Sequence, residues 1–264
     1  AYKQLNSDHT NLTLNPRKIN FINYLKEQVK YHDSPVATIN SLLSFILYKK
    51  IKKDKFRVTI NGIGSDEIFT GYYDHHLLFL NEIKKNKKCF NKSKKNWEKI
   101  VKPIVKNPYL KKSNLYIKNP SFRKHVYQYE NFKKNIFNEK FRFNFTEKKY
   151  STSLMKNRMA NEMFNEVVPV VLKEDDLNSM YNSIESRSPF LDSELFQSAF
   201  NMPADYYVKD GLAKWPLRKM ISEYVPEKIR LNPRKTGFNA SIKDILKLDS
   251  KGIKYLMKEN EIFK

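Results

Sequence analysis

Residues 56–72 have the sequence FRVTINGIGSDEIFTGY, in which an apolar run leads into a glycine-rich turn with two acidic residues. The run Phe56–Ile60 predicts a buried β-strand, and the turn follows at its carboxyl end. Open α/β sheets bind their ligands at this end of their strands. A Gly-x-Gly sequence also occurs in ordinary tight turns, so this segment alone indicates a binding site only weakly.

The segments on either side of the turn predict the fold class. Apolar residues have helical spacing from Asn15 to about Tyr31 and again from Ile39 to Ile51, and the strand follows. Two helices, a strand and an acidic turn in this order are typical of the closing part of a parallel α/β sheet. Further helices are predicted over residues 74–79, 153–168, 193–201, 212–224 and 241–257, so the second half is mostly helical.

Residues 84–150 differ in composition from the rest of the chain. They are rich in lysine, asparagine and aromatic residues, and Pro103, Pro108 and Pro120 interrupt any long element. We expect short helices with aromatic anchors here and no catalytic residues. A poorly ordered surface insertion is the alternative, because the charge of this segment is high.

Composition argues against several classes of protein. The net charge is +22, but the lysines are spread over the chain, whereas nucleic-acid-binding proteins usually gather them on one face. The single cysteine, Cys89, leaves no intramolecular disulfide and fits a reducing cytoplasm. The histidines form no i, i+4 pair for zinc, and no apolar stretch approaches the roughly 20 residues of a membrane span. We therefore expect a soluble cytoplasmic protein without a nucleic-acid or membrane partner.

A second segment of the sequence supports a functional role for the turn. Residues 176–192, DLNSMYNSIESRSPFLD, follow the turn in the order and with the residue types of the synthetase domain of glutamine-dependent asparagine synthetases. The chain resembles that family from about His32 to Phe238. The resemblance implies a partial Rossmann-like parallel sheet of the adenine nucleotide alpha-hydrolase type. Residues 1–80 would be the C-terminal part of this nucleotide-binding sheet, 81–150 a helical insertion, and 151–264 a helical part that completes the site.

The resemblance also assigns an activity and its site residues. Such ligases use ATP and Mg²⁺ to activate a carboxylate as an acyl-adenylate, release pyrophosphate, and let ammonia attack. Asp66 and Glu67 match the acidic pair of the family's turn and would lie at the magnesium site. Residues 61–64, Asn61, Gly62, Ile63 and Gly64, would approach the nucleotide. The alternative is that Asp66 and Glu67 merely cap the helix that follows.

Two basic segments complete the resemblance. The stretch DGLAKWPLR, residues 210–218, is similar to the family's Gly-x-x-Lys-x-x-Leu-Arg, whose lysine stabilises charge on the reacting phosphate. Lys214 would take that role, and Arg218, one helical turn on, would support it or pair with a carboxylate. RKTGF, residues 234–238, resembles the family's Arg/Lys-x-Gly-Phe loop, a cationic lid element or simply a basic turn.

The chain departs from the family pattern at three places. The phosphate loop Ser-Gly-Gly-x-Asp-Ser and the N-terminal glutamine-hydrolysing cysteine are not in this sequence, which begins at Ala1, and we expect them upstream or on another chain. Ile63 replaces a glutamate of the turn. Asn40 replaces the arginine that contacts aspartate.

These departures imply a small-molecule carboxylate acceptor other than aspartate. A glutaminase domain or subunit would supply the ammonia, and a homo-oligomer is possible. A non-catalytic binding or scaffold module with the same fold is the alternative function.

Overall fold

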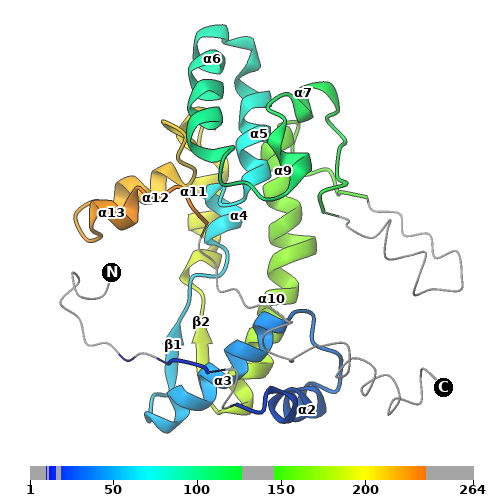
Figure 1. Cartoon of the computed structure of the whole chain (residues 1–264), viewed down its shortest axis with the longest axis vertical. Helices are drawn as coiled ribbons and strands as arrows, with labels where there is room; N and C mark the ends of the chain where they lie inside the picture. The colour runs from blue at the N-terminus through cyan, green and yellow to red at the C-terminus, as the bar shows by residue number, and fades with distance from the viewer. Residues whose placement is uncertain (1–9, 11, 16–18, 127–145, 236–264) are drawn as a thin grey trace, which may run out of the picture. The chain divides into compact units, whose positions relative to one another are not determined.

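The computed structural model describes residues 10, 12–15, 19–126 and 146–235 (Figure 1). These residues form two compact units. The larger unit comprises the described residues within Gly62–Val168 and Phe190–Lys235, and the smaller unit those within Asp8–Asn61 and Pro169–Pro189. Each unit contains residues from more than one of the three predicted segments 1–80, 81–150 and 151–264. The division into these three segments stays a prediction.

The larger unit is helical, and four of its elements pack against α4, the helix that carries Asp66 and Glu67. Helix α4 contacts α9, η4, α11 and α12. The elements of this unit are α4 (Ser65–Phe69), α5 (Tyr73–Glu82), η1 (Ile83–Lys85), α6 (Lys87–Asn96), η2 (Trp97–Val101), η3 (Pro108–Lys111), α7 (Leu115–Lys118), α9 (Leu154–Asn161), η4 (Glu162–Glu166), η5 (Pro189–Leu191, from its second residue), α11 (Ser193–Asn201), η6 (Ala204–Tyr206), α12 (Trp215–Met220) and α13 (Glu227–Arg230).

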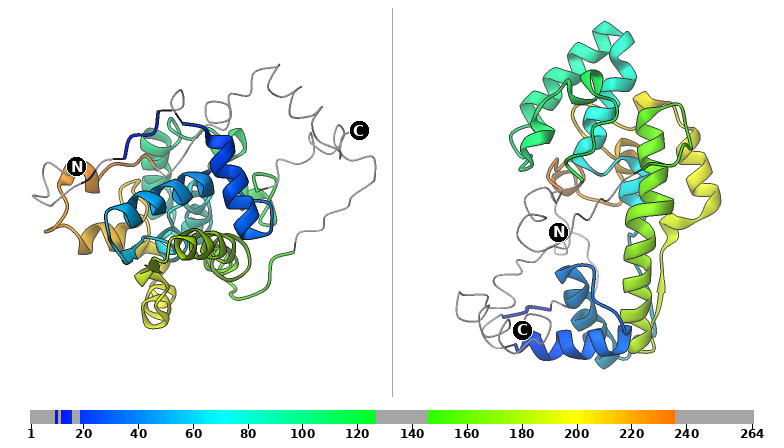
Figure 2. Two further views of the ribbon diagram at one scale, coloured as in Figure 1. Left: turned by 90° about the horizontal axis from the view of Figure 1, so that it is seen from below. Right: turned by 90° about the vertical axis from the view of Figure 1, so that its right-hand side faces the viewer.

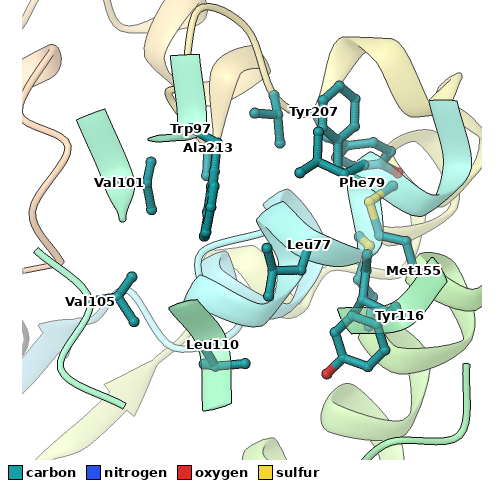
Figure 3. Packing of buried hydrophobic residues seen from close by; sticks show 14 residues of the cluster. Leu77, Phe79, Trp97, Val101, Val105, Leu110, Tyr116, Met155, Tyr207 and Ala213 are labelled. Atoms are coloured by element: carbon teal, nitrogen blue, oxygen red, sulfur yellow. The ribbon is translucent and has the colours of Figure 1, made fainter. Parts of the chain in front are cut away.

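The core of the larger unit is built on α5 and on aromatic residues of the lysine-rich segment (Figure 3). Leu77, Trp97, Tyr116, Met155 and Tyr207 are each at most 2% exposed. Burying a large aromatic side chain contributes about 1.5–3 kcal/mol, which offsets the cost of ordering a charged segment. The expectation of short helices with aromatic anchors is confirmed for residues 84–126, and residues 127–145 lie outside the described part.

The smaller unit combines helices with a parallel strand pair. It contains α2 (Phe21–His32), α3 (Ile39–Lys53), β1 (Val58–Ile60), most of α10 (Val167–Tyr181) and β2 (Glu185–Arg187). Strands β1 and β2 pair in parallel, with Thr59 opposite Ser186. Helices α2 and α3 contact each other (Figure 2). Phe21, Leu42 and Ile46 form the buried cluster of these two helices. The predictions of both helices and of a mixed α/β fold with a parallel sheet are confirmed.

The prediction that Phe56–Ile60 is a buried strand is wrong in two respects. The strand begins at Val58, and its apolar side chains face solvent, with Val58 46% and Ile60 76% exposed. Alternation along the strand puts Thr59 on the opposite, partly buried face. Among the described residues β2 is the one strand that pairs with β1, so apolar content alone overestimated how much of the strand is covered.

Two helix boundaries also differ from expectation. The helix predicted to end at Val168–Pro169 continues as α10, because the preceding π-helical turn η4 starts a new hydrogen-bonding frame and Pro169 lies in the first turn. The helix predicted over 212–224 is only α12, since Lys214 adopts a left-handed conformation and Pro216 follows it. The helix predicted over 241–257 lies outside the described residues.

Helix α11 begins and ends where the sequence predicts, at Ser193 and Asn201. The side chain of Asp192 accepts hydrogen bonds from the amides of Glu194 and Leu195 and so caps the helix. None of the helices in the described part of the chain is both long enough and apolar enough to cross a membrane.

Candidate functional site

The turn after β1 positions two acidic side chains at the start of α4. Gly64 has φ +93°, which favours glycine, and a Cβ here would lie 2.4 Å from Leu191 Cδ2. Helix α4 begins at the next residue and buries Ile68 and Phe69 on its inner side. This packing fixes the helix, so Asp66 and Glu67 in its first turn have defined directions.

The carboxylate of Asp66 is paired with two lysines of the larger unit. Its Oδ1 lies 2.7 Å from Lys214 Nζ, and its Oδ2 lies 3.4 Å from Lys235 Nζ. Lys214 also donates to Ser65 Oγ at 3.0 Å. Burial acts to raise the pKa of Asp66, but the two ammonium groups outweigh it and hold the pKa below its usual value. Asp66 is therefore ionised, as a metal- or cation-binding carboxylate must be.

Lys214 lies in a segment with an unusual backbone conformation. A tight hairpin turn at Asp210 and Gly211, both with positive φ, pairs Lys209 with Leu212. Two residues later Lys214 has φ +56°, a conformation that costs a non-glycine residue on the order of 1 kcal/mol. The packing of this segment holds the lysine there, and its side chain reaches back across the turn to Asp66.

Gly71 is a further requirement of the site that the sequence analysis missed. A Cβ at this position would lie 1.7 Å from Asp66 Oδ1 and 2.6 Å from Lys214 Cε. The amide of Gly71 donates to the carbonyl of Asp66 at 2.7 Å, so the chain folds directly over the ion pair. The Thr-Gly-Tyr sequence after α4 was the available signal, since glycine marks a close approach of backbone to another group.

Glu67 has a different environment from Asp66. It is 4% exposed, accepts a hydrogen bond from the Tyr72 hydroxyl and bonds its own backbone amide. Burial raises the pKa of Glu67 above its usual value, and the Tyr72 hydrogen bond only partly offsets this. Mg²⁺ prefers oxygen ligands, and the partly exposed carboxylate of Asp66 is therefore a better candidate for the ion than that of Glu67, which has little access to water.

Lys235 and Tyr72 also belong to the site, and neither was singled out from the sequence as a site residue. The ammonium group of Lys235 lies 3.5 Å from the centroid of the Tyr72 ring, and its backbone amide donates to the Tyr73 hydroxyl at 3.2 Å. The basic segment at 234–238 was the signal for Lys235. The ring of Tyr72 could not be placed without knowing that the chain turns at Gly71.

Arg218 does not point to Asp66 but binds backbone carbonyls. Its Nε donates to the carbonyl of Ala213 at 2.6 Å, and its terminal nitrogens donate to the carbonyls of Arg230 and Asn232. Ala213 directly precedes Lys214, and Asn232 precedes Lys235 by three residues. Arg218 thus ties together the two segments that carry the lysines, while its predicted catalytic role stays a prediction.

The remaining nucleotide-site candidates are on the turn itself. The side-chain amide of Asn61 donates to Ser186 and Asp175 and accepts from Ser188 within the smaller unit. Gly62 is exposed, and a Cβ on it would meet nothing within 4 Å. Ile63 is partly buried. Their predicted contact with a nucleotide stays a prediction.

A second cluster of charged side chains lies in the interior of the larger unit. Asp74, His75 and Glu162 present ligand atoms within 4.8 Å of one another and are buried. Arg158 lies among them, with Nε 3.0 Å from Glu162 Oε1 and 3.9 Å from Asp74 Oδ2, and it also pairs with Glu147 and Glu166. Its guanidinium supplies the positive charge that a metal would, so we interpret this cluster as a structural ion-pair network.

Comparison with known proteins agrees with the resemblance read from the sequence. The family model described as Asparagine synthase matches residues 1–258. The "Asparagine synthetase [glutamine-hydrolyzing] 1" of Bacillus subtilis (strain 168) is 27% identical over 244 residues, which are 86% of this chain and 37% of that protein. Two proteins named "Putative asparagine synthetase [glutamine-hydrolyzing]", from Mycobacterium bovis and Mycobacterium tuberculosis, are each 35% identical over 77 residues. These residues are 29% of this chain and 12% of each of those proteins.

The chain thus spans well under half the length of these curated relatives. No solved structure was found that matches it. The family match covers both the Gly-rich turn and the segment of Lys214, whose side chains the fold brings together. The chain belongs to the asparagine synthase family.

Proposed function

We propose that this chain is the synthetase part of an ATP-dependent amide-forming ligase, with a sheet of the adenine nucleotide alpha-hydrolase type, acting in the cytoplasm. The observation that carries the proposal is the ion pair between Asp66 and Lys214 beside a glycine-rich turn. Both residues match functional positions of the family, and they lie far apart in the sequence. A purely structural pair would not need a strained lysine backbone or a glycine beneath the carboxylate.

The proposed reaction has two steps. A carboxylate oxygen of the acceptor attacks the α-phosphorus of ATP, pyrophosphate leaves, and an acyl-adenylate forms. Ammonia then attacks the acyl carbon, AMP leaves, and a proton from the nitrogen passes to solvent. Asp66 would hold Mg²⁺, which supplies charge neutralisation at the phosphates. Lys214 would stabilise negative charge on the reacting phosphate, since its flexible stem lets the ammonium follow the phosphoryl oxygens.

The acceptor is proposed to be a small-molecule carboxylate other than aspartate. At the position where the family has a glutamate in the turn, Ile63 can neither accept a proton nor hold an ammonium-like group. At the position of the family's arginine, Asn40 offers no charge for an α-carboxylate. Ammonia would come from a glutaminase domain or subunit, and assembly as a homo-oligomer is part of the same proposal.

Pyrophosphate release tests the proposal. We would incubate the chain, and any longer polypeptide that its reading frame encodes, with Mg·ATP, glutamine and a panel of carboxylates that includes aspartate. Lys214→Ala should lower release by about 100-fold or more, the usual effect of removing one charge-stabilising group. Lys219→Ala, an exposed lysine of α12, is the matched control and should leave release unchanged. Release with aspartate alone would contradict the proposed acceptor class.

A non-catalytic binding or scaffold module is the second candidate, and the residues at Ile63 and Asn40 favour it. It predicts no pyrophosphate release with any carboxylate, together with retained folding of the Lys214→Ala variant. Release that depends on Lys214 with any acceptor would exclude this candidate.

A further inference from the structure

A pocket of about 290 Å³ lies in the smaller unit, between the end of α2 and one face of α10. Helix α2 ends because Asp33, with φ +49°, adopts a left-handed conformation. The segment that follows reaches α10, where the backbone amide of Ala37 donates to Glu174 Oε1. The residues of α10 that line the pocket recur at a spacing of about one helical turn and so share one face of the helix.

Most of the wall of this pocket is apolar. Its apolar side chains are Pro35, Ala37, Pro169, Val170 and Leu177. The two prolines have no backbone N–H, so the wall around them offers no donor to a polar ligand. The volume is at the lower end of the range for small-molecule sites, which suits a ligand of the size of an amino acid and is too small for a nucleotide.

A buried histidine brings an unused hydrogen-bond acceptor to the lining of the pocket. His32 is 8% exposed, and its Nε2 lies 3.1 Å from Asn178 Oδ1. The side-chain nitrogen of Asn178 donates to the carbonyl of Ser41 at 3.2 Å, which identifies Oδ1 as the acceptor toward His32. Nε2 of His32 is therefore the donor, and the neutral imidazole has its lone pair on Nδ1. In the described part of the chain Nδ1 has no hydrogen-bond partner.

Two charged side chains of α10 complete the lining. Glu174 uses Oε1 to accept from Ala37, so its other oxygen is left for a ligand. Lys173 is exposed, and no carboxylate of the described residues pairs with it. The pocket thus combines one cation, two acceptors and an apolar wall.

We propose that this pocket binds a free apolar α-amino acid, such as leucine. The carboxylate of the ligand pairs with Lys173, and its ammonium group donates to Glu174 and to Nδ1 of His32. The apolar side chain of the ligand lies against Val170 and Leu177, which removes it from water.

The three parts of the lining select this class of ligand together. A carboxylic acid without an ammonium group leaves both acceptors unused, and a small polar amino acid leaves the apolar wall in water. The proposal goes beyond the proposed function and does not depend on it, because no residue proposed for the reaction at Asp66 lines the pocket.

Calorimetric titration of the full chain without ATP tests the ligand class. The ligands are leucine, leucinamide, which lacks the carboxylate, isocaproate, which lacks the ammonium group, and glycine, which lacks the side chain. Leucine should bind with a dissociation constant of about 1 mM or below, the scale for a ligand of this size. Each of the other three should bind at least about threefold more weakly, because each loses one of the contacts.

A change at Lys173 tests the contact to the carboxylate. Lys173→Met should lower the affinity for leucine about threefold or more and remove the preference for leucine over leucinamide. Lys52→Met is the matched control, since Lys52 is an exposed lysine of α3 outside the pocket, and it should change neither affinity. A preference for leucine over leucinamide that survives in Lys173→Met would overturn the assignment of the carboxylate to this lysine.

Two tryptophan variants test the location. Val170 is 46% exposed and lines the pocket, so Val170→Trp should fill it and lower leucine affinity at least about tenfold. Val171, 40% exposed, does not line it, and Val171→Trp should bind leucine as the wild type does. Urea midpoints of both variants show that they are folded. Equal binding of leucine and isocaproate, unchanged leucine binding in Val170→Trp, or no leucine binding by the wild type would each overturn the proposal. Pyrophosphate release is measured separately, so neither result decides the other.

Discussion

At Gly71 the site has room for a hydrogen atom but not for a Cβ. Replacing it with alanine would put a Cβ 1.7 Å from Asp66 Oδ1, so the carboxylate must move away from Lys214. The moving atom is the end of a flexible side chain, so we expect a loss of only about 1 kcal/mol in the free energy of unfolding. Binding of Mn·ATP should fall more strongly than stability. Urea denaturation and calorimetry on the same sample measure the two effects.

Gly62→Ala is the comparison for that experiment. A Cβ at Gly62 meets nothing within 4 Å, and its φ is not in the left-handed region. The free energy of unfolding should therefore stay within about 0.5 kcal/mol of the wild type. An equal loss of stability in both alanine variants would show that the clash with Asp66 is not what makes glycine necessary at Gly71.

The two acidic residues of α4 should respond to pH in opposite directions. Burial raises the pKa of Glu67 above its usual 4.5, so the folded state binds this proton more tightly than the unfolded state. The stabilisation is present below about pH 4.5 and is lost as the pH rises through the folded pKa. Glu67→Gln should therefore lose less stability than the wild type between pH 4.5 and 7.5, as measured by urea midpoints.

For Asp66 the contribution to stability changes with pH in the opposite direction. Burial would raise its pKa, but Lys214 and Lys235 hold it below its usual 3.8. Its stabilisation is present above pH 3.8 and is lost as the pH falls through the folded pKa. Asp66→Asn should lower stability at pH 7.5 and converge with the wild type in strong acid. Parallel pH profiles for Glu67→Gln and Asp66→Asn would refute the two assignments.

At the scale of elements, the charged interior ties α5 to α9 and η4. Arg158 is 3% exposed and pairs with Glu147, Glu162 and Glu166. Burial lowers the pKa of His75, but Glu162 and Asp74 outweigh it and raise the pKa, so these two carboxylates favour the protonated form of the imidazole. Removing the guanidinium would leave buried carboxylates without a counter-charge, which costs about 3–5 kcal/mol.

The variant that tests this is Arg158→Leu. We expect its thermal midpoint to fall by about 8 °C or more, or the protein to lose its folded state. Lys94→Met removes an exposed pair with Glu98 at 4.0 Å and should leave the midpoint unchanged. If Arg158→Leu had the same thermal midpoint as the wild type, another group would have to supply the counter-charge for the carboxylates. The interpretation of the cluster as an ion-pair network would then fail.

Helices were predicted well where periodicity and caps agree, and poorly where backbone conformation intervenes. Helix α11 has a capping Asp192, and α3 a clear apolar stripe, so both follow from local sequence. Helix α12 starts later than predicted because Lys214 is left-handed, and α10 passes through Pro169 because a π-turn precedes it. Neither feature has a reliable signature in the residue types themselves.

At the scale of the whole molecule, motif order predicted the family and two of the three charged groups of the site. Asp66 and Lys214 were found because their flanking residues match a known pattern. Lys235, Tyr72 and Gly71 were not assigned to the site, since the basic segment at 234–238 and the Thr-Gly-Tyr sequence do not show which distant residues they contact. The exposed side chains of β1 were missed for the same reason, because burial is decided by what covers a strand.

The charge of +22 also belongs to the whole molecule, and it sets the last prediction. Lysines spread over the surface attract any polyanion, but without a concentrated patch they neutralise few phosphates at once. Binding to a nonspecific 20-base-pair duplex should be detectable at 50 mM salt and weaker than about 1 µM at 0.15 M, the ordinary range for nonspecific contacts. Fluorescence anisotropy against salt concentration measures it. Submicromolar binding that persists at 0.15 M salt, and that competes with Mn·ATP, would mean that the lysines at Asp66 serve a nucleic-acid ligand, because a small nucleotide would not displace duplex from scattered surface charges.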